Sequence, residues 1–293
     1  MKKITLTVAL LLGVFATAFA QDPEPNASRK DDVFHITLGL AGGINGFTVD
    51  NGLDGALKVG PNAGFEFGFY CFPTEHVGIR TGVNAVYAAS AYNYDKINGT
   101  LAYREAPYTI DYNYVANDAK LDVSTIALQV PLQLALKSTH WYANLGFKMM
   151  IPIDFKAKTS LDVTDVKATI RETGTLLDPE STDPFASSMA RLFGCGKYNG
   201  SASKKTMNLA ENWTILAAVD FGYRFASTSS TTWTIGVYAD YSLTKLKPQN
   251  DFINVRAASG RQKKVTVKGI PISHLGYFDA GIKIQCDFGL KVK

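Results

Sequence analysis

Acidic and basic side chains recur at every second position inside several apolar runs of the chain. In the run 213–225, Asp220 and Arg224 lie on one face, and the opposite face is apolar. Across the chain the same pattern predicts inward-facing charges at Glu66, Arg80, Lys148, Asp220, Arg224, Asp240, Asp279, Lys283 and Asp287. Because an unpaired buried charge is costly, these residues predict a paired, hydrogen-bonded polar core. A narrow path for ions or protons is the alternative that this set leaves open.

The four histidines are the next candidates for chemistry. His35, His76 and His140 fall near the same ends of their runs, where three rings could suggest a metal site. No carboxylate or cysteine has ligand spacing to them, and histidine is ordinary at a membrane interface. His274 follows Ser273, which leaves a catalytic pair as a further alternative. The chain has no phosphate-binding glycine loop, no H-E-x-x-H and no G-x-S-x-G, so we expect no catalytic, metal or cofactor site.

The three cysteines are expected to be free thiols. Cys195 falls in a long loop at one end of the fold, and Cys71 and Cys286 fall toward the other end. A further strand is expected between Cys71 and Cys286, which puts their Cα atoms beyond disulfide reach.

Strict period-2 alternation predicts the elements that carry these residues. Runs 213–225 and 233–243 form a hairpin of this kind, with tryptophan, tyrosine and phenylalanine near the ends of the apolar face. An apolar outer face and a polar inner face are typical of a membrane barrel. The expected strands cover residues 34–40, 63–69, 77–87, 126–136, 141–151, 213–225, 233–243 and 278–288. We therefore predict an all-β fold, an antiparallel up-and-down transmembrane β-barrel of about eight strands. Pro131 cannot donate to the ladder, and a bulge is expected there.

The first residues have the pattern of a secretory signal peptide. Lys2 and Lys3 precede an apolar stretch, and Ala18-Phe19-Ala20 gives a cleavage site between Ala20 and Gln21. An uncleaved anchor is the alternative, but the stretch is shorter than the roughly 20 residues of a spanning helix. The predicted organisation is a signal peptide at 1–20, a short periplasmic segment at 21–32 and the barrel at 33–293. Average hydropathy is −0.02, which a barrel with alternating faces can have.

Short and long connections alternate along the chain. Short turns are expected near residues 72–75, 138–139 and 228–229, and long extracellular loops at 42–58, 93–120, 158–212 and 247–273. This sorting is typical of outer-membrane barrels and places both termini in the periplasm. In the third loop, Asp183 and Pro184 predict the start of a helix over 185–193 that could cover the barrel mouth.

Two of these long loops have compositions that suggest contacts. Half of the 14 tyrosines lie between Tyr87 and Tyr114, where they either stack on sugars or mark the membrane interface and strands extended past it. The last loop is basic and would attract lipopolysaccharide phosphates or anionic glycans.

Three segments resemble a known family. The strand Leu128–Lys137, the closing strand 274–284 and Gly222–Phe225 are similar to strands of the PorT-like outer-membrane β-barrel proteins of Bacteroidetes. The resemblance covers most of the chain after about Val33, and it implies an eight-stranded barrel of the size of OmpA or OmpX. The matching segments are strand patterns and carry no chemistry of their own.

Together these features predict a non-enzymatic protein of the cell outer membrane that presents long loops for a structural, adhesion, glycan-contact or assembly role. A narrow porin for small solutes is the first alternative. A barrel of eight strands is filled by its own side chains and leaves no wide channel. A barrel enzyme acting on lipid is the second. The expected partners are outer-membrane lipid and lipopolysaccharide, with an extracellular glycan or a periplasmic protein as further possibilities. A nucleic-acid partner is excluded by location.

Overall fold

The computed structural model describes residues 33–50, 53–105, 107–193, 195–197, 206–208, 213–225, 231–246, 252–257, 265–271 and 274–290. The predicted signal peptide, its cleavage site at Ala20 and Gln21, and the periplasmic segment 21–32 lie outside these residues.

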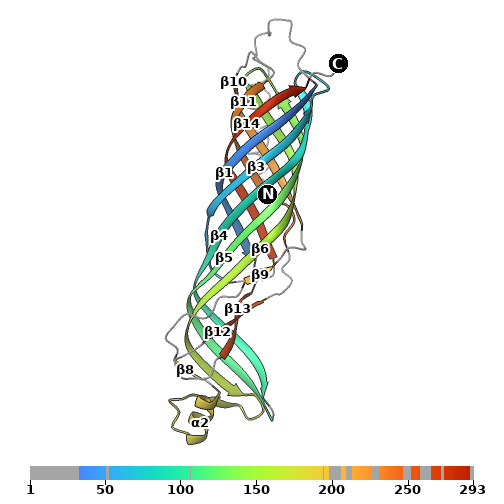
Figure 1. Cartoon of the computed structure of the whole chain (residues 1–293). Helices are drawn as coiled ribbons and strands as arrows, with labels where there is room; N and C mark the ends of the chain where they lie inside the picture. The colour runs from blue at the N-terminus through green and yellow to red at the C-terminus, as the bar shows by residue number, and fades with distance from the viewer. Residues whose placement is uncertain are drawn as a thin grey trace, which may run out of the picture.

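A closed ring of antiparallel strands forms the body of the protein (Figure 1). The ring consists of β1 (Phe34–Asp50), β3 (Gly60–Cys71), β4 (Val77–Glu105), β5 (Tyr108–Lys137), β6 (Trp141–Ile170), β10 (Thr214–Phe225), β11 (Thr231–Ser242) and β14 (His274–Leu290). Each strand pairs with its neighbours in this order, β14 pairs with β1, and β6 pairs directly with β10. The eight-stranded antiparallel barrel predicted from the alternation is confirmed.

The outer wall of the ring is apolar and the inner wall is polar. On β10 and β11, Val219 and Ile235 point outward and are exposed. Their chain neighbours Asp220 and Thr234 point inward and are buried. Exposed tryptophans lie near both edges of this belt, at Trp141, Trp213 and Trp233. An apolar belt with aromatic edges around a polar interior is the surface of a membrane-spanning β-barrel.

Pro131 lies within β5 without the predicted bulge. The register between β4 and β5 is the same on both sides of it, and the ladder instead lacks the pairs between residues 82–83 and 130–131. Gly82 lies opposite, with φ of +152°, a conformation that favours glycine. The missing donor of Pro131 is therefore accommodated by a local gap in the ladder.

Much of the predicted loop sequence is strand. β1 continues to Asp50, β4 and β5 pair from Asn93↔Lys120 to Glu105↔Tyr108, and β6 continues to Ile170. The predictions of long loops at 42–58, 93–120 and 158–212 were wrong to this extent. β4, β5 and β6 form a three-stranded sheet that projects far beyond the barrel (Figure 1), and we call this sheet the extension.

The faces of the extension have the opposite character to those of the barrel. On β5 the outward positions change from exposed Ile126 to polar Ser124 and Asp122, and the inward positions change from Gln129 to Val123 and Leu121. The outward face of β6 is likewise polar from Lys156 onward. A sheet whose outer face is polar is solvated on that face, so the extension leaves the membrane.

Bulges keep the apolar residues of the extension facing inward. The β5–β6 register shifts at Ile126/Ala127, at Val115/Ala116 and between Asn117 and Lys120. At the last of these, Asp118 has φ of +46°. An extra residue in one strand restores the inward orientation of the apolar positions that follow.

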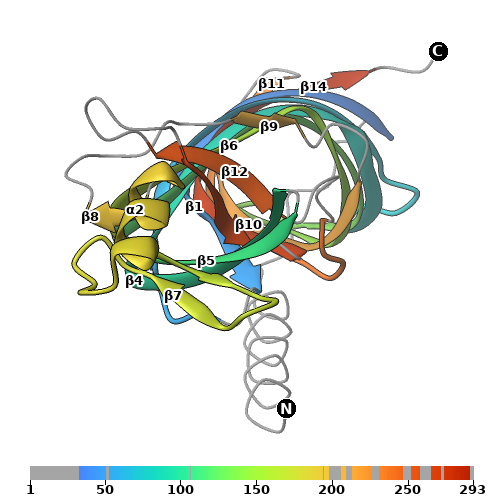
Figure 2. The same ribbon diagram turned by 90° about the horizontal axis from the view of Figure 1, so that it is seen from below.

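Short elements pack around the extension. They are β2 (Ala56–Lys58), β7 (Thr175–Leu177), α2 (Pro184–Leu192), β8 (Gly196–Lys197), β9 (Thr206–Asn208) and the hairpin of β12 (Phe252–Ala257) and β13 (Val265–Pro271). β7, β8 and β9 pair with β6, and the β12–β13 hairpin lies against the extension (Figures 1 and 2). This hairpin lies within residues 247–273, which were predicted to be a long loop.

The helix in the third predicted loop is confirmed. Asp183 is its N-cap and accepts a hydrogen bond from the Phe185 N–H at 2.9 Å, with Pro184 as the first helical residue. The helix lies at the far tip of the extension and not across the barrel mouth (Figure 1), because β6 carries the chain outward before the helix begins.

Candidate functional site

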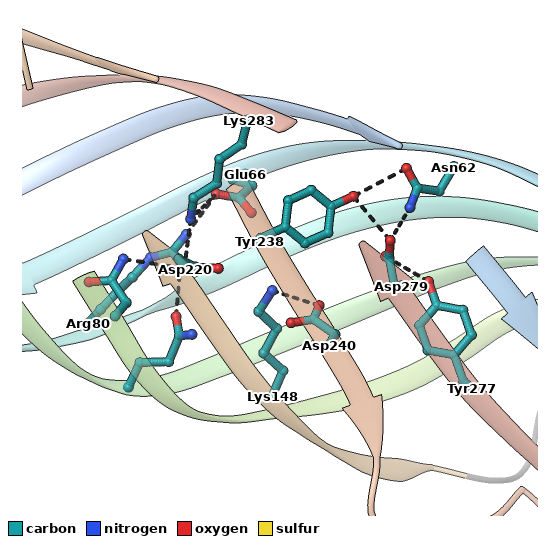
Figure 3. Close-up of polar contacts among 12 residues, drawn as sticks. Asn62, Glu66, Arg80, Lys148, Asp220, Tyr238, Asp240, Tyr277, Asp279 and Lys283 are labelled. Carbon is teal, nitrogen blue, oxygen red and sulfur yellow. Dashed lines mark hydrogen bonds and ion pairs between the residues drawn. The ribbon is translucent and has the colours of Figure 1, made fainter. Parts of the chain in front are cut away.

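Arg80 joins two carboxylates in the polar interior of the barrel (Figure 3). Its guanidinium lies 2.7 Å from Glu66 and 2.7 Å from Asp220, and it donates to the Gln133 side-chain oxygen at 2.9 Å. The side chains of Arg80 and Asp220 have no exposed surface and that of Glu66 is 6% exposed, so both ion pairs are buried. Buried charges of this kind are stable only as a matched set.

Lys283 completes this first cluster. Its ammonium lies 2.7 Å from the Asp220 carboxylate and 3.9 Å from Glu66. The Gln285 amide donates to Glu66 at 2.6 Å. Arg80 and Lys283 thus balance Glu66 and Asp220, and we call these four residues the ion cluster.

A second polar group lies next to the ion cluster, toward the extension (Figure 3). Lys148 pairs with Asp240 at 2.8 Å. Asp279 accepts hydrogen bonds from Asn62 and, at 2.8 Å, from the Tyr277 hydroxyl, and the Tyr238 hydroxyl lies 3.1 Å away. In the described chain, neutral donors and not a cation hold Asp279.

Two of the predicted interior residues lie apart from these clusters. Arg224 is half-buried at the end of the barrel where residues 73–76 and 138–140 form short turns, which we call the turn end. Its Nη1 donates to the Ser138 carbonyl at 2.8 Å and not to Asp220. Asp287, also half-buried, accepts a hydrogen bond from the Thr37 hydroxyl at 2.6 Å. Arg224 and Asp287 each lie four residues closer to the turn end than the ion-cluster residue on the same strand, Asp220 or Lys283. The prediction that both belong to one paired core with the other charges was therefore wrong.

Alternation contained a signal for the polar residues that were missed. Tyr238 has the same strand parity as Asp240, and Tyr277 the same parity as Asp279. Both side chains point inward, where their hydroxyls contact Asp279.

Apolar side chains close the interior on the extension side of Asp279. Phe47 packs against Phe155 and Tyr277, with ring centroids 5.3 and 5.0 Å apart. Leu216 and Met150 are fully buried in the same cluster. The two cavities detected among the polar side chains have volumes of about 20 and 10 Å³. Cavities of this size have room for about one water molecule.

The histidines have structural contacts at the turn end. His35 meets the Phe72 ring edge-on, His76 Nδ1 lies 3.2 Å from the Lys137 carbonyl, and His140 stacks with Tyr223. Among the described residues, no group of three histidine, cysteine or acidic side chains could hold a metal ion. Ser273, the suggested partner of His274, lies outside the described residues.

The tyrosine-rich segment is largely internal to the extension. Tyr94, Tyr112 and Tyr114 are buried, and Tyr87 is exposed at the apolar belt. These positions agree with the prediction that the tyrosines mark the membrane interface and strands that extend past it.

The three cysteines are free, as predicted. Cys195 is buried beside α2, where its N–H donates to the Ala190 carbonyl at 2.8 Å. Burial raises the pKa of the Cys195 thiol to about 12.

Within the described part of the chain, no helix is long and apolar enough to span a membrane.

Comparison with known proteins found structural likeness alone. No family model matches the chain, and no curated protein matches it. The solved structures that resemble it include Neisserial surface protein A (8% identity, 89% of this chain and 100% of that chain, TM-score 0.28) and the attachment invasion locus protein Ail of Yersinia pestis (8%, 86% and 97%, TM-score 0.28). The outer membrane protease OmpT of Escherichia coli is a third (10%, 90% and 99%, TM-score 0.32).

The third of these is an outer membrane protein by its name, but likeness at this level carries no argument about function. The architecture itself, a closed barrel with an apolar belt, is that of an outer-membrane β-barrel protein. The resemblance to the PorT-like proteins stays a prediction.

Proposed function

We propose that the protein is a non-enzymatic outer-membrane barrel with a filled interior, and that it presents the extension outside the cell as a contact surface. The roles that fit are adhesion, glycan contact or assembly with another surface component. The observation that carries the proposal is the continuous pairing of β4, β5 and β6 beyond the apolar belt. From Ser124 to Tyr108, β5 alone reaches about 50 Å at the usual rise per residue.

The orientation follows from the connections. The turn end carries the short turns and the start of β1, so we place it in the periplasm and the extension outside. The outward face of the extension then offers polar side chains, such as Lys156, Lys158 and Lys167, to the surroundings. Lipopolysaccharide around the barrel is the nearest expected partner, and glycans or proteins at the tip are the more distant ones.

The filled interior favours a scaffold over the narrow porin. The ion cluster and the Lys148–Asp240 pair span the lumen with side chains of opposite charge. On the extension side of them lies a layer of apolar side chains, which we call the Phe47 cluster: Phe47, Met150, Phe155, Leu216 and Tyr277. A conducting path would have to open both layers.

A shortened variant tests the proposal. The variant carries two replacements, with one Asn-Gly turn in place of residues 95–118 and a second in place of residues 160–204. Tyr94 and Ala119 already pair across the first replacement. On the far side of the second, β9 keeps its pairing with Lys156–Lys158. Wild-type and shortened proteins in liposomes are applied to an array of surface glycans and extracellular-matrix proteins. We expect saturable binding of the wild type to one class of probe and loss of that binding in the shortened protein.

The control is the heat-dependent gel mobility of both proteins, which should show a closed barrel in each. Equal binding by the shortened protein, or no binding by the wild type across the whole panel, would contradict the proposal. Turnover of a lipid substrate by the wild type would favour the enzyme alternative instead.

A further inference from the structure

A small pocket lies at the turn end of the barrel, between the ion cluster and the solvent. Its volume is about 20 Å³, and the polar residues that line it include His35, Lys137, Tyr142, Arg224, Thr234 and Asp287. Arg224 and Asp287 are half-buried, so the pocket is reached from the turn end. The amides of Asn144 and Gln285, which donate to Asp220 and Glu66, separate the pocket from the ion cluster.

Two buried hydroxyls in the pocket lack hydrogen-bond partners among the described residues. Tyr142 is 6% exposed and Thr234 is 2% exposed. A buried hydroxyl without a partner costs about 1–3 kcal/mol in general. Tyr142 and Thr234 both line the pocket, so a group bound there could accept a hydrogen bond from each hydroxyl.

Neighbouring glycines position the Tyr142 hydroxyl. Gly222 and Gly236 are directly opposite each other on β10 and β11, and Gly222 is opposite Tyr142 on β6. A Cβ at Gly236 would collide with the Tyr142 hydroxyl, and a Cβ at Gly222 with its ring. The absence of side chains at these two positions lets the tyrosine lie across the strands.

The charges around the pocket are mainly positive. The Arg224 Nη1 donates to the Ser138 carbonyl, and no carboxylate among the described residues forms an ion pair with Arg224. The other N–H groups of the guanidinium can therefore donate to a ligand. Lys137 lies with its ammonium 4.1 Å from the centre of the Phe72 ring. Asp287 is the one carboxylate among the lining residues, and its Oδ1 accepts from Thr37.

We propose that this pocket binds one small anionic group, a carboxylate or a phosphate, through the Arg224 guanidinium and the hydroxyls of Tyr142 and Thr234. Lys137 adds positive charge to the wall. The enclosed volume is little more than that of one water molecule, so only part of the anionic group enters it and the rest of the ligand stays in solvent at the turn end. The anion is therefore either a free ion or the acidic end of a longer chain. The inference does not depend on the role proposed for the extension.

Titration of the refolded full-length protein with acetate and with inorganic phosphate tests the site, at constant ionic strength. Nuclear magnetic resonance signals of the Tyr142 and Thr234 amides report binding. We expect saturable shifts confined to the turn end, with midpoints in the millimolar range. Arg224→Gln should weaken binding about tenfold because a charge-assisted hydrogen bond is lost. Tyr142→Phe should weaken it by a smaller factor while it keeps the ring in place.

Arg171→Gln is the matched control, since Arg171 is exposed and pairs with Asp111 at the far tip. It should leave the midpoints unchanged, and the gel mobility of each variant reports folding. A short peptide with a free terminal carboxylate and its amidated form distinguish the sources. Tighter binding of the free peptide than of acetate assigns the site to the end of a chain, and equal binding assigns it to a free ion. Shifts that do not saturate, or that survive unchanged in Arg224→Gln and Tyr142→Phe, would overturn the proposal.

Discussion

Arg80 and Asp220 are 140 residues apart in the chain and 2.7 Å apart in the barrel, and neither side chain has exposed surface. Arg80 also holds Glu66, so one guanidinium joins β4 to β3 and, across the lumen, to β10.

Replacement of Arg80 should destabilise the barrel strongly. Arg80→Ala leaves Glu66 and Asp220 with Lys283 as their remaining cation, and removal of one partner from a buried ion pair costs about 3–5 kcal/mol. Urea titration of refolded protein, followed by tryptophan fluorescence, measures the change. Arg224→Ala is the control and should cost about 1 kcal/mol, since it removes the hydrogen bond to the Ser138 carbonyl. A larger loss from Arg224→Ala than from Arg80→Ala would contradict the assignment of the ion cluster.

A charge on the outer wall should be costly only within the apolar belt. Val219→Arg places a guanidinium on the exposed apolar face, at a cost of about 2–4 kcal/mol near the middle of the membrane. Ser160→Arg, on the outward face of the extension, should change stability by less than about 0.5 kcal/mol. The same urea titration compares them. Similar costs at the two sites would mean that the membrane boundary is placed wrongly.

The bulge at Asp118 gives a test of the extension. Its φ of +46° is left-handed, a conformation that costs a β-branched residue about 1–2 kcal/mol. Asp118→Val should therefore loosen the tip of β4 and β5, and Asp118→Gly should not. Hydrogen exchange of the amides between residues 108 and 117 measures the effect. Equal exchange in the two variants would argue against the bulge.

The Cys195 thiol should be unreactive at neutral pH. Burial raises its pKa from the ordinary 9.0 to about 12, so the thiol stays protonated in the folded protein at pH 8. We expect slow maleimide labelling in the native state and fast labelling in denaturant, read by mass spectrometry. Between pH 9 and 12 the unfolded chain loses this proton first, so stability contributed by the neutral thiol falls as pH rises. Fast labelling of native protein at pH 8 would show that Cys195 is not covered as described.

The sequence predicted the ring of strands because alternation is local to each strand. Asp220 and Val219 could be assigned to opposite walls from the residues on either side of them. The extension was missed because its faces reverse: Leu121 and Val123 point inward where the barrel rule expects outward apolar residues, and bulges at Asp118 and Ile126/Ala127 break the period. When the apolar face changes sides and bulges interrupt the alternation, the sequence has no continuous strand pattern and is predicted to be a loop.

Partners across the lumen could not be predicted in the same way. Whether Asp220 meets Arg224, four residues along its own strand, or Arg80, on a strand across the ring, depends on the stagger of all eight strands. The sequence identified the inward-facing charges individually, and the closed ring decided which of them meet.

Single-channel recording on purified wild-type protein in a planar lipid bilayer tests the central claim most directly. The account predicts no steady conductance, because the ion cluster and the Phe47 cluster fill the lumen in series. A reproducible conductance in the wild type, with an ion preference that shifts in Arg80→Ala, would contradict the account and establish the barrel as a narrow pore.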